Sequence, residues 1–381
     1  MKIENRVNEI FEDMVDVRRH LHKHPELSNE EYKTQEFIMN FLKDLDIECF
    51  PCANTGVVAT IGKIKPCIGI RADIDALPIQ EINDINYKST KPGVMHACGH
   101  DVHTTILLGT AKILKEMENQ LQNSVKLLFQ PAEETTGGAL PMIQEGVLED
   151  VDYVIGLHVM PYLEVGQIEI KHGQLNAASN GIHIKIKGQS GHGAYPEKGV
   201  DSIMVSANLL TALQTIVSRN TSPLDSTVLS FGTIQGGQKA NIICDEVNLK
   251  GTLRTLTPES RAYSLKRIEE ITKHVCIAHQ ADYEINIEEG YEPLINDNDL
   301  VDYIKKTLEN DFDIVHKDKP SLGVEDFSYF SNRVKGAFYH LGCSNHRSNS
   351  LHQNDFDVDE NCIKSGILSQ IKLVMNMKRA D

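Results

Sequence analysis

The sequence predicts an α/β protein in which a mostly parallel sheet carries helices on both faces and a smaller α+β domain is inserted. Three observations predict this fold class. The chain has 381 residues, which is longer than one hydrophobic core usually grows, so two domains are expected. Its first half interleaves short apolar runs with segments of helical periodicity. Near residue 178 the pattern changes to strict alternation of apolar and polar residues, which indicates a half-exposed strand.

The N-terminal part alternates helices with short strands. Apolar residues recur at helical spacing in 3–23, 33–45, 104–117 and 138–146. Short apolar runs, which we predict to be strands, occupy 56–61, 67–70, 125–129 and 153–157. Because these strands are apolar almost throughout, we expect them to be buried on both faces of one sheet.

The inserted domain has the element order β-α-β-β-α-β. We predict strands and helices in turn over 182–187, 202–219, 227–234, 246–255, 259–279 and 282–287. That order is the ferredoxin-like split unit with an antiparallel sheet. After Tyr291 the chain returns to a helix, an apolar strand and a closing helix over 298–308, 337–341 and 360–377. The predicted domains are therefore 1–178 with 292–381, and the insertion 179–291, which a loop tip can accommodate.

Composition excludes several classes of protein. The formal net charge is −16 and no stripe of Lys and Arg offsets it, which disfavours nucleic acid as a partner. No apolar run is long enough to span a membrane, and the N-terminus shows no secretory signal. Eight cysteines are scattered without the spacing of a disulfide framework, which predicts reduced thiols and a cytoplasmic location. Cys49 and Cys52 could form a redox pair, but we expect two thiols in an edge strand.

Polar side chains, most of them of metal-binding types, follow the predicted strands. Arg71, Asp73 and Asp75 follow one strand, Glu133 and Glu134 another, His158 ends a third, and the segment containing His352 follows a fourth. A loop containing Cys98 and three histidines opens the helix at 104. Ligands gather outside the carboxyl ends of the strands in open α/β sheets, so we expect these groups at one edge.

The residue types are those of a transition-metal site: thiolate, imidazole and carboxylate. Cys98 and His100, two residues apart in an irregular loop, can face one ion. Glu133 and Glu134 are adjacent in an extended segment, so their side chains point apart and one can bind metal while the other serves as base. A divalent metal lowers the pKa of a water molecule from about 15.7 towards 7, so a carboxylate can take its proton at neutral pH.

The sequence resembles the M20 metallopeptidase family, and within it the aminoacylase-like amidohydrolases. That branch includes hippurate hydrolases, indole-acetyl-amino-acid hydrolases and N-acetyldiaminopimelate deacetylases. The resemblance covers nearly the whole chain and rests on nine segments in order: RRHLHKHPELSNEE (18–31), RADIDALPI (71–79), MHACGHDVH (95–103), LLFQPAEE (127–134), GLH (156–158), GHGAYP (191–196), NIICDEVNLKGTLRT (241–255), GVEDFSYF (323–330) and LHQNDFDVDE (351–360).

The resemblance implies a site with two divalent ions per subunit, of Zn, Mn, Co or Ni. By matched position its ligands are Cys98, His100, Glu134, His158 and His352. Glu133 is then the general base in the hydrolysis of an acyl amino acid to a carboxylic acid and an amino acid. Alternatives are an N-acetyldiaminopimelate deacetylase or small-dipeptide peptidase of the same family, and a non-catalytic binding protein of this fold. A thiol amidase with Cys98 as nucleophile and His100 as base would leave the other three ligand-type residues unexplained.

The resemblance also implies that the inserted domain is a lid through which two subunits pair. Arg254 is then expected to hold the α-carboxylate of the substrate, and Asn241 to contact the substrate, although a surface arginine is a competing interpretation. His192 is expected to donate to the developing oxyanion in the partner subunit's site, or else to be a turn residue. Glu197 and Cys244 depart from the family pattern, which uses His and Pro there, and this bears on the substrate.

Two further groups near the predicted site received structural roles. We expect Asp73 to orient a ligand imidazole from behind. We do not assign Arg71 to metal, although the wider family more often has a ligand histidine there. His20, His22 and His24 resemble a metal cluster, but their position on a helix and its end predicts that they cap and solvate that helix.

Overall fold

The chain divides into two compact units. The structure, a computed structural model, describes residues 3–347 and 350–377. Unit 1 comprises Met1–Leu175, Ile295–Lys319 and Asp326–Asp381, and unit 2 comprises Asn176–Leu294 and Pro320–Glu325. The predicted insertion, 179–291, falls within unit 2, which additionally takes in the segment before Asp326.

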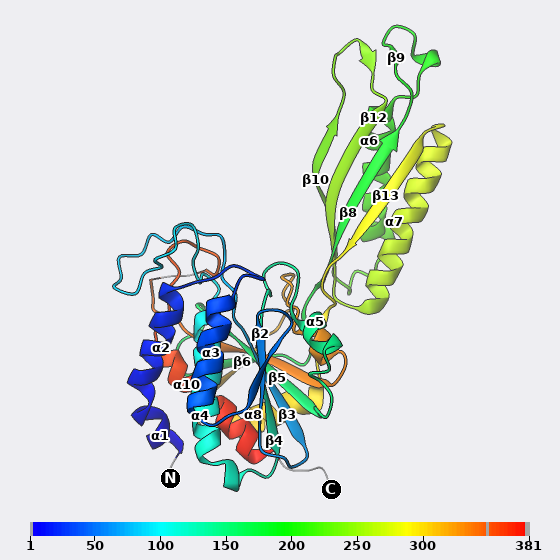
Figure 1. Ribbon diagram of the computed structural model, residues 1–381. Helices are drawn as coiled ribbons and strands as arrows, with labels where there is room; N and C mark the ends of the chain where they lie inside the picture. The colour runs from blue at the N-terminus through cyan, green and yellow to red at the C-terminus, as the bar shows by residue number, and fades with distance from the viewer. Residues whose placement is uncertain (1–2, 348–349, 378–381) are drawn as a thin grey trace. The chain divides into compact units, whose positions relative to one another are not determined.

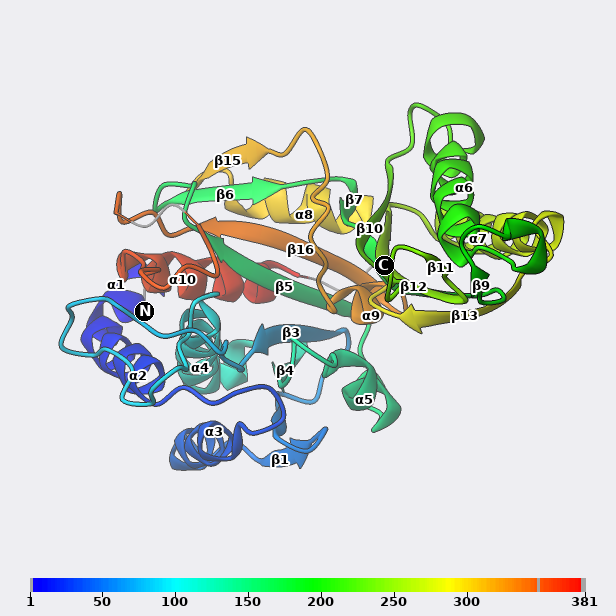
Figure 2. The same ribbon diagram turned by 90° about the horizontal axis from the view of Figure 1, so that it is seen from above.

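Unit 1 is built on an eight-stranded sheet with the order β1-β2-β4-β3-β5-β16-β6-β15. Its strands are β1 (Cys49–Cys52), β2 (Gly56–Ile61), β3 (Cys67–Asp73), β4 (Ser124–Gln130), β5 (Tyr153–Met160), β6 (Gln167–Ile170), β15 (Asp313–His316) and β16 (Lys335–Gly342). The four central strands, β4, β3, β5 and β16, all run parallel, and antiparallel pairs flank them. Figure 2 shows the strands side by side. The predicted mostly parallel sheet is confirmed.

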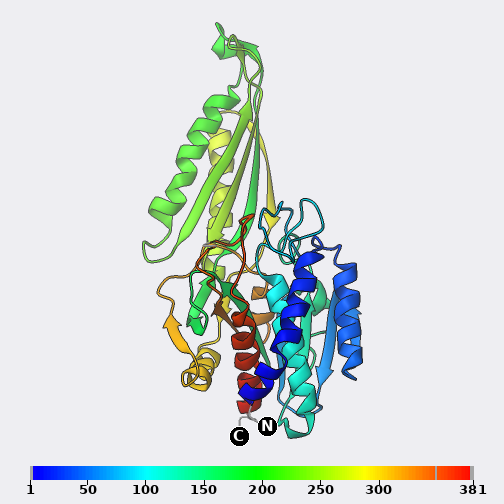
Figure 3. The same ribbon diagram turned by 90° about the vertical axis from the view of Figure 1, so that its left-hand side faces the viewer.

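The helices of unit 1 pack their apolar side chains into one core with the sheet. They are α1 (Ile3–Glu9), α2 (Phe11–Lys23), α3 (Tyr32–Asp44), α4 (His100–Glu116), α5 (Ala139–Gln144), α8 (Asn298–Leu308), α9 (Ser328–Ser331) and α10 (Asn361–Asn376). α4 is buried almost all round, because it packs against β3 as well as against α2 and α10 (Figure 3). The ligand-type loop that precedes α4 is therefore attached to a helix that is buried along almost its whole length.

The edge strand β1 contains the two cysteines considered as a redox pair. Cys49 and Cys52 are both buried in it, as expected for an edge strand rather than a helix start. Burial raises the pKa of the Cys49 thiol, and burial together with Glu145 raises the pKa of Cys52 to about 12. A raised thiol pKa lowers the thiolate fraction, so this pair is poorly suited to redox chemistry.

The prediction for His22 was wrong, whereas His24 lies where expected. His24 contacts the backbone oxygen of His20 through Nδ1 at 2.8 Å, at the end of α2. His22 is fully buried, and its ring nitrogens lie 2.8 Å from Asp101 Oδ2 and 3.3 Å from Glu81 Oε1. Because α2 packs on α4, the buried carboxylate of Asp101 needs partners from α2, and His22 is one of them.

Unit 2 has the predicted β-α-β-β-α-β order. Its antiparallel sheet has the order β10-β12-β8-β13, and two helices pack on it: β8 (Ala178–Lys187), α6 (Ser202–Thr215), β10 (Thr227–Gly236), β12 (Glu246–Thr255), α7 (Pro258–Ala278) and β13 (Asp282–Glu289). Buried and half-buried residues alternate along β8, so one face meets the helices (Figure 1). Two short strands, β9 (Gly191–His192) and β11 (Ile242–Ile243), pair separately.

The remaining pair is β7 (Gly173–Asn176) with β14 (Leu294–Asn296). Among the described helices of both units, none combines the length and apolar character that a membrane crossing requires.

Candidate metal centre

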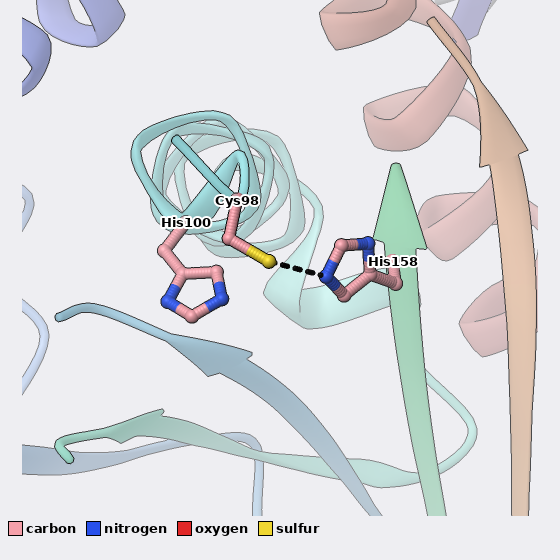
Figure 4. Close-up of side chains that lie close together, drawn as sticks. All are labelled: Cys98, His100 and His158. Carbon is pink, nitrogen blue, oxygen red and sulfur yellow. Dashed lines mark hydrogen bonds between the residues drawn. The ribbon is translucent and has the colours of Figure 1, made fainter. Parts of the chain in front are cut away.

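A glycine turn at the start of α4 places two of the predicted ligands. Cys98 and His100 flank Gly99, which has a φ of +88°. A Cβ built on Gly99 would lie 2.3 Å from Val159 Cγ2, so a side chain at this position would push α4 away from β5. Glycine therefore lets Cys98 approach His158, the β5 residue next to Val159, as Figure 4 shows.

The five predicted ligand residues come together in unit 1. Cys98 Sγ lies 3.3 Å from His158 Nε2 and 3.3 Å from His352 Nε2. Glu134 Oε1 lies 3.2 Å from His352 Nε2 and 3.8 Å from His100 Nε2. Four separate parts of the chain supply these atoms: β5, the segment after β4, the start of α4 with the residues just before it, and the segment before α10.

The donor atoms form overlapping groups of three. Within each group the atoms lie within 4.8 Å of one another: Cys98, His100 and His158; Cys98, Glu134 and His352; and His100, Glu133 and Glu134. Cys98, His100 and Glu134 each belong to two of these groups. Thiolate, imidazole and carboxylate at such spacing suit a transition-metal ion, and the sharing of donors leaves room for two neighbouring ions.

Hydrogen bonds donated to backbone carbonyl oxygens fix the orientation of two of the imidazoles. His158 Nδ1 lies 2.8 Å from the carbonyl oxygen of Val159, and His100 Nδ1 lies 3.0 Å from that of Asp75. A carbonyl oxygen can only accept, so Nδ1 carries the proton in both rings. Nε2 of each ring is then the nitrogen that faces the other ligand atoms, and it is the one that can offer its lone pair to a metal ion.

Two buried polar atoms at the centre lack hydrogen bonds. His100 Nε2 and Glu134 Oε1 have no well-aligned hydrogen-bond partner in the described part of the chain, although His352 Nε2 is near the latter. A buried polar atom without a partner costs free energy, and native proteins rarely contain one without a reason. Both atoms are of types that coordinate metal ions, and they face each other across the centre. The residues present therefore fit a bound cation.

The pKa shifts of Cys98 and His100 also fit a bound cation. Burial, followed by the carboxylate of Glu134, raises the pKa of the Cys98 thiol well above its usual range. Burial lowers the pKa of His100, but Asp73 and Asp75 outweigh burial and raise it to about 10. Buried carboxylates account for the rise at His100 and add to the effect of burial at Cys98, and a divalent cation would offset their charge.

Asp75 links two predicted ligands, and sequence reasoning did not single it out. Its Oδ1 lies 3.1 Å from His100 Nδ1, while its Oδ2 accepts from the backbone N–H of Glu134 at 3.1 Å and from Ser28 Oγ at 2.7 Å. Asp73, which we expect to orient a ligand, contacts His103 Nδ1 at 2.6 Å and lies 3.6 Å from the Nε2 atom of the predicted ligand His100. The sequence signal for Asp75 was its place with Asp73 in the polar cluster that follows a predicted strand.

Asp75→Asn is expected to weaken metal binding by about 10- to 100-fold, the usual range for an outer partner of a ligand. An amide in place of the carboxylate must turn an N–H towards either His100 Nδ1–H or the N–H of Glu134. Calorimetric titration of metal into the metal-free protein measures the change. Asp84→Asn, at an exposed aspartate, is the matched control. Equal affinity for Asp75→Asn and the control would contradict the link.

Two residues near the centre, His103 and Arg71, make contacts that leave them unavailable as metal ligands. His103 Nε2 accepts from the backbone N–H of Val159 at 2.9 Å and its Nδ1 meets Asp73, so both ring nitrogens are occupied. Arg71 is fully buried and pairs with Asp73 at 2.7 Å and with Asp326 at 2.9 Å. A guanidinium cannot deprotonate to bind a cation, which agrees with leaving Arg71 out of the ligand set.

The other three predicted site residues, His192, Asn241 and Arg254, lie in unit 2. His192 is exposed in β9, and its Nδ1 accepts from the backbone N–H of Ala194 at 3.0 Å. The carbonyl oxygen of Asn241 accepts from the N–H of Gly193 at 2.9 Å, so Asn241 contacts the turn that carries His192. Arg254 lies on β12 with its side chain partly buried.

Comparison with known proteins identifies relatives over the full length. The sequence pattern of peptidase family M20/M25/M40 matches residues 69–376. The chain is similar to N-acetyl-L-cysteine deacetylase of Bacillus subtilis, with 41% identity over 92% of this chain and 84% of that protein. It is also similar to N-acetyldiaminopimelate deacetylase of Bacillus velezensis, with 36% identity over 93% of this chain and 96% of that protein.

A solved structure shares the fold. The chain is similar to the YXEP protein of Bacillus subtilis, described as a dinuclear metal binding peptidase of the M20 family. The two have a TM-score of 0.86 and 30% identity, over 97% of this chain and 98% of that one.

Proposed function

We propose that this chain, which belongs to peptidase family M20/M25/M40 and is a metal-dependent amidohydrolase, cleaves the amide bond of small N-acyl amino acids. The observation that carries the proposal is the convergence of Cys98, His100, Glu134, His158 and His352 on one centre, with Glu133 beside it. Deacetylases acting on N-acetyl amino acids among the relatives support the substrate class.

Two divalent ions held by these five residues would supply a Lewis acid for the carbonyl and would lower the pKa of a water molecule. Some ligand atoms belong to two neighbouring groups of three, which supports two ions rather than one. A ligand set of thiolate and imidazole suits Zn, Mn, Co or Ni. His158 and His100 offer Nε2 because their Nδ1 protons are held by backbone oxygens.

Glu133 is the proposed general base. It is nearly fully buried, and its carboxylate falls in the same group of donors as His100 and Glu134. Glu133 and Glu134 lie in a turn and not in the extended segment that the sequence predicted, and their carboxylates come within 4.8 Å of each other. We assign metal binding to Glu134, whose Oε1 faces His100 and His352, and proton transfer to Glu133. The Glu133 carboxylate takes the proton of the attacking water and gives it to the amine that leaves, so the acyl group departs as a carboxylic acid.

The experiment that tests this function measures free amine released by the metal-loaded protein from a panel of amides. The acyl half is varied over acetyl, benzoyl and indole-acetyl groups, and the amino-acid half independently, with N-acetyldiaminopimelate and small dipeptides included. Release from acyl amino acids supports the proposal, and preference for N-acetyldiaminopimelate or dipeptides selects the corresponding alternative. No release from any member would favour a non-catalytic binding protein.

Arg254 is the proposed anchor for the substrate's α-carboxylate. Its guanidinium donates to Leu253 O at 3.1 Å and to Thr252 Oγ1, and burial alone lowers its pKa, with no carboxylate of the described residues contributing. A partly buried guanidinium without a carboxylate partner is suited to binding an anion bidentately. Asn241, which contacts the turn that carries His192, is proposed to contact the substrate as well.

Arg254→Ala is expected to raise KM for acyl amino acids by about 10- to 100-fold, as for a lost hydrogen bond to a charged group. Amidated analogues lack the carboxylate, so their KM is expected to change little. Steady-state kinetics with both substrate types measure the difference, and Arg219→Ala, at an exposed arginine of the same unit, is the control. Equal losses for acid and amide substrates would remove Arg254 from this role.

Two further features belong to the proposal. We propose a homodimer paired through unit 2, in which His192 of one subunit serves the other subunit's centre. We also propose a cytoplasmic location, which all eight cysteines, free and buried, support because that compartment keeps thiols reduced.

A further inference from the structure

The segment 26–31, which precedes α3, has no role in the proposed chemistry, yet it reaches the strand end that carries Glu133. We propose that Glu31 is a positioning residue that sets the place of Glu133 by holding Ala132 in a left-handed backbone conformation. Its effect on turnover rests on the proposed function, whereas its effect on the backbone does not.

Ala132 adopts an unfavourable conformation. Its φ is +56°, in the left-handed region that residues with a Cβ rarely occupy. It immediately precedes Glu133 and Glu134, so its backbone angles decide where both carboxylates point. A residue in such a conformation persists only when its surroundings hold it there.

Glu31 supplies one of the contacts that hold Ala132. The Glu31 side chain is fully buried, and its Oε1 accepts the backbone N–H of Ala132 at 2.8 Å. Its Oε2 accepts from Thr55 Oγ1 at 2.5 Å, so the carboxylate is itself fixed. Next to Thr55, a Cβ on Gly56 would lie 2.7 Å from Pro131 Cδ, which shows how closely this strand approaches the loop.

The same loop is held at two more points. Gly137 N–H donates to the carbonyl oxygen of Ala132 at 2.9 Å, and Glu134 N–H donates to Asp75. Ser28, from the same segment as Glu31, donates to Asp75 Oδ2, the oxygen that also accepts the N–H of Glu134. One short segment therefore contacts the loop of Glu133 and Glu134 and also Asp75, which in turn contacts His100.

Glu31 does not serve as a helix cap, although it stands at the N-cap position of α3. Its side chain makes no capping hydrogen bond. Capping is done by Glu26, whose Oε2 accepts the N–H groups of Lys33 and Thr34, both at 2.9 Å. The two buried glutamates of this segment thus have different roles: Glu26 caps the helix, and Glu31 holds the loop that contains Glu133.

The test compares Glu31→Met with Glu31→Gln and with the control Glu26→Met. Methionine cannot accept the Ala132 N–H, whereas the glutamine carbonyl can do so while its amide faces Thr55 Oγ1. Hydrogen exchange of the peptide containing Ala132 reports on the contact without substrate. Steady-state kinetics, bound metal and Tm are measured on the same preparations.

Glu31→Met is expected to speed exchange at Ala132 and to lower kcat by about 10- to 100-fold, as for a small misplacement of a catalytic group, with little change in KM. Glu31→Gln is expected to restore most of kcat. Glu26→Met is expected to lower Tm while kcat of the folded protein is kept. Adding Ala132→Gly to Glu31→Met is expected to recover part of kcat, because glycine adopts positive φ without the strain.

Native exchange at Ala132 in Glu31→Met would overturn the proposal, as would equal losses of kcat in Glu31→Met and Glu26→Met. If Glu31→Met does not fold, Glu31→Asp answers the same question, since it keeps the charge but cannot reach Ala132. If the native protein releases no amine from any amide, the proposed function fails, and the exchange data still decide whether Glu31 holds Ala132.

Discussion

Glu133→Gln is expected to bind the same amount of metal as the native protein and to lose turnover by about 10²- to 10⁴-fold, the usual contribution of a general base. Glutamine keeps the size of the side chain but cannot take a proton. Because Glu133 is nearly fully buried, a side chain of equal volume also preserves the packing around it. Metal analysis and kcat on one preparation measure both parts of the prediction.

Glu134→Gln is the matched variant. Glu134 Oε1 faces both His352 and His100, so its replacement is expected to lower metal content as well as activity. If Glu133→Gln lost its metal and Glu134→Gln kept it, Glu133 would be the metal ligand and Glu134 the general base.

His192→Ala is expected to lower kcat by about 10²- to 10³-fold with a smaller change in KM, because an oxyanion donor acts mainly in the transition state. His192 Nδ1 accepts the N–H of Ala194, so the ring proton sits on Nε2. The ring is exposed and flanked by Gly191 and Gly193, and its Nε2–H is a neutral donor. Such a donor suits the oxygen of a polarised carbonyl.

The shared-site proposal makes a stronger prediction for mixtures. Inactive His192→Ala and inactive Glu133→Gln proteins, mixed in equal amounts, are expected to regain about a quarter of native activity, since half of the dimers are mixed and one site in each is intact. Subunit exchange is followed with two affinity tags on the two variants. Exchange without any recovery of activity would exclude a site built from two subunits.

The fold was largely predictable because its signals are local. The helix α8 was predicted with its observed bounds, since Asp297 caps it and an apolar stripe follows. The break between α1 and α2 at Ile10 was missed, because no proline or glycine marks it. The short strands β6 and β15 were missed because both mix charged with apolar residues, and their pairing depends on partners far along the chain.

The residue types of the candidate site were predictable from the sequence, but the contacts that hold those residues in place were not. Ligand-type residues after predicted strands indicated a metal centre, and the resemblance to a family gave each residue its proposed role. The contacts of His22 with Asp101, of Asp75 with His100 and of Glu31 with Ala132 join segments distant in sequence. None of them leaves a periodicity or a spacing, so only the folded chain reveals them.

The central claim, a metal-dependent amidohydrolase with Glu133 as base, is tested most directly by amine release against added metal. Metal-free protein is titrated with one divalent metal while free amine is measured with the best substrate of the panel. The account predicts activity that rises to about two equivalents per chain, vanishes with chelator and returns with metal, but stays low in Glu133→Gln. Full turnover in chelator, abolished by iodoacetamide, would contradict it and would make Cys98 the nucleophile.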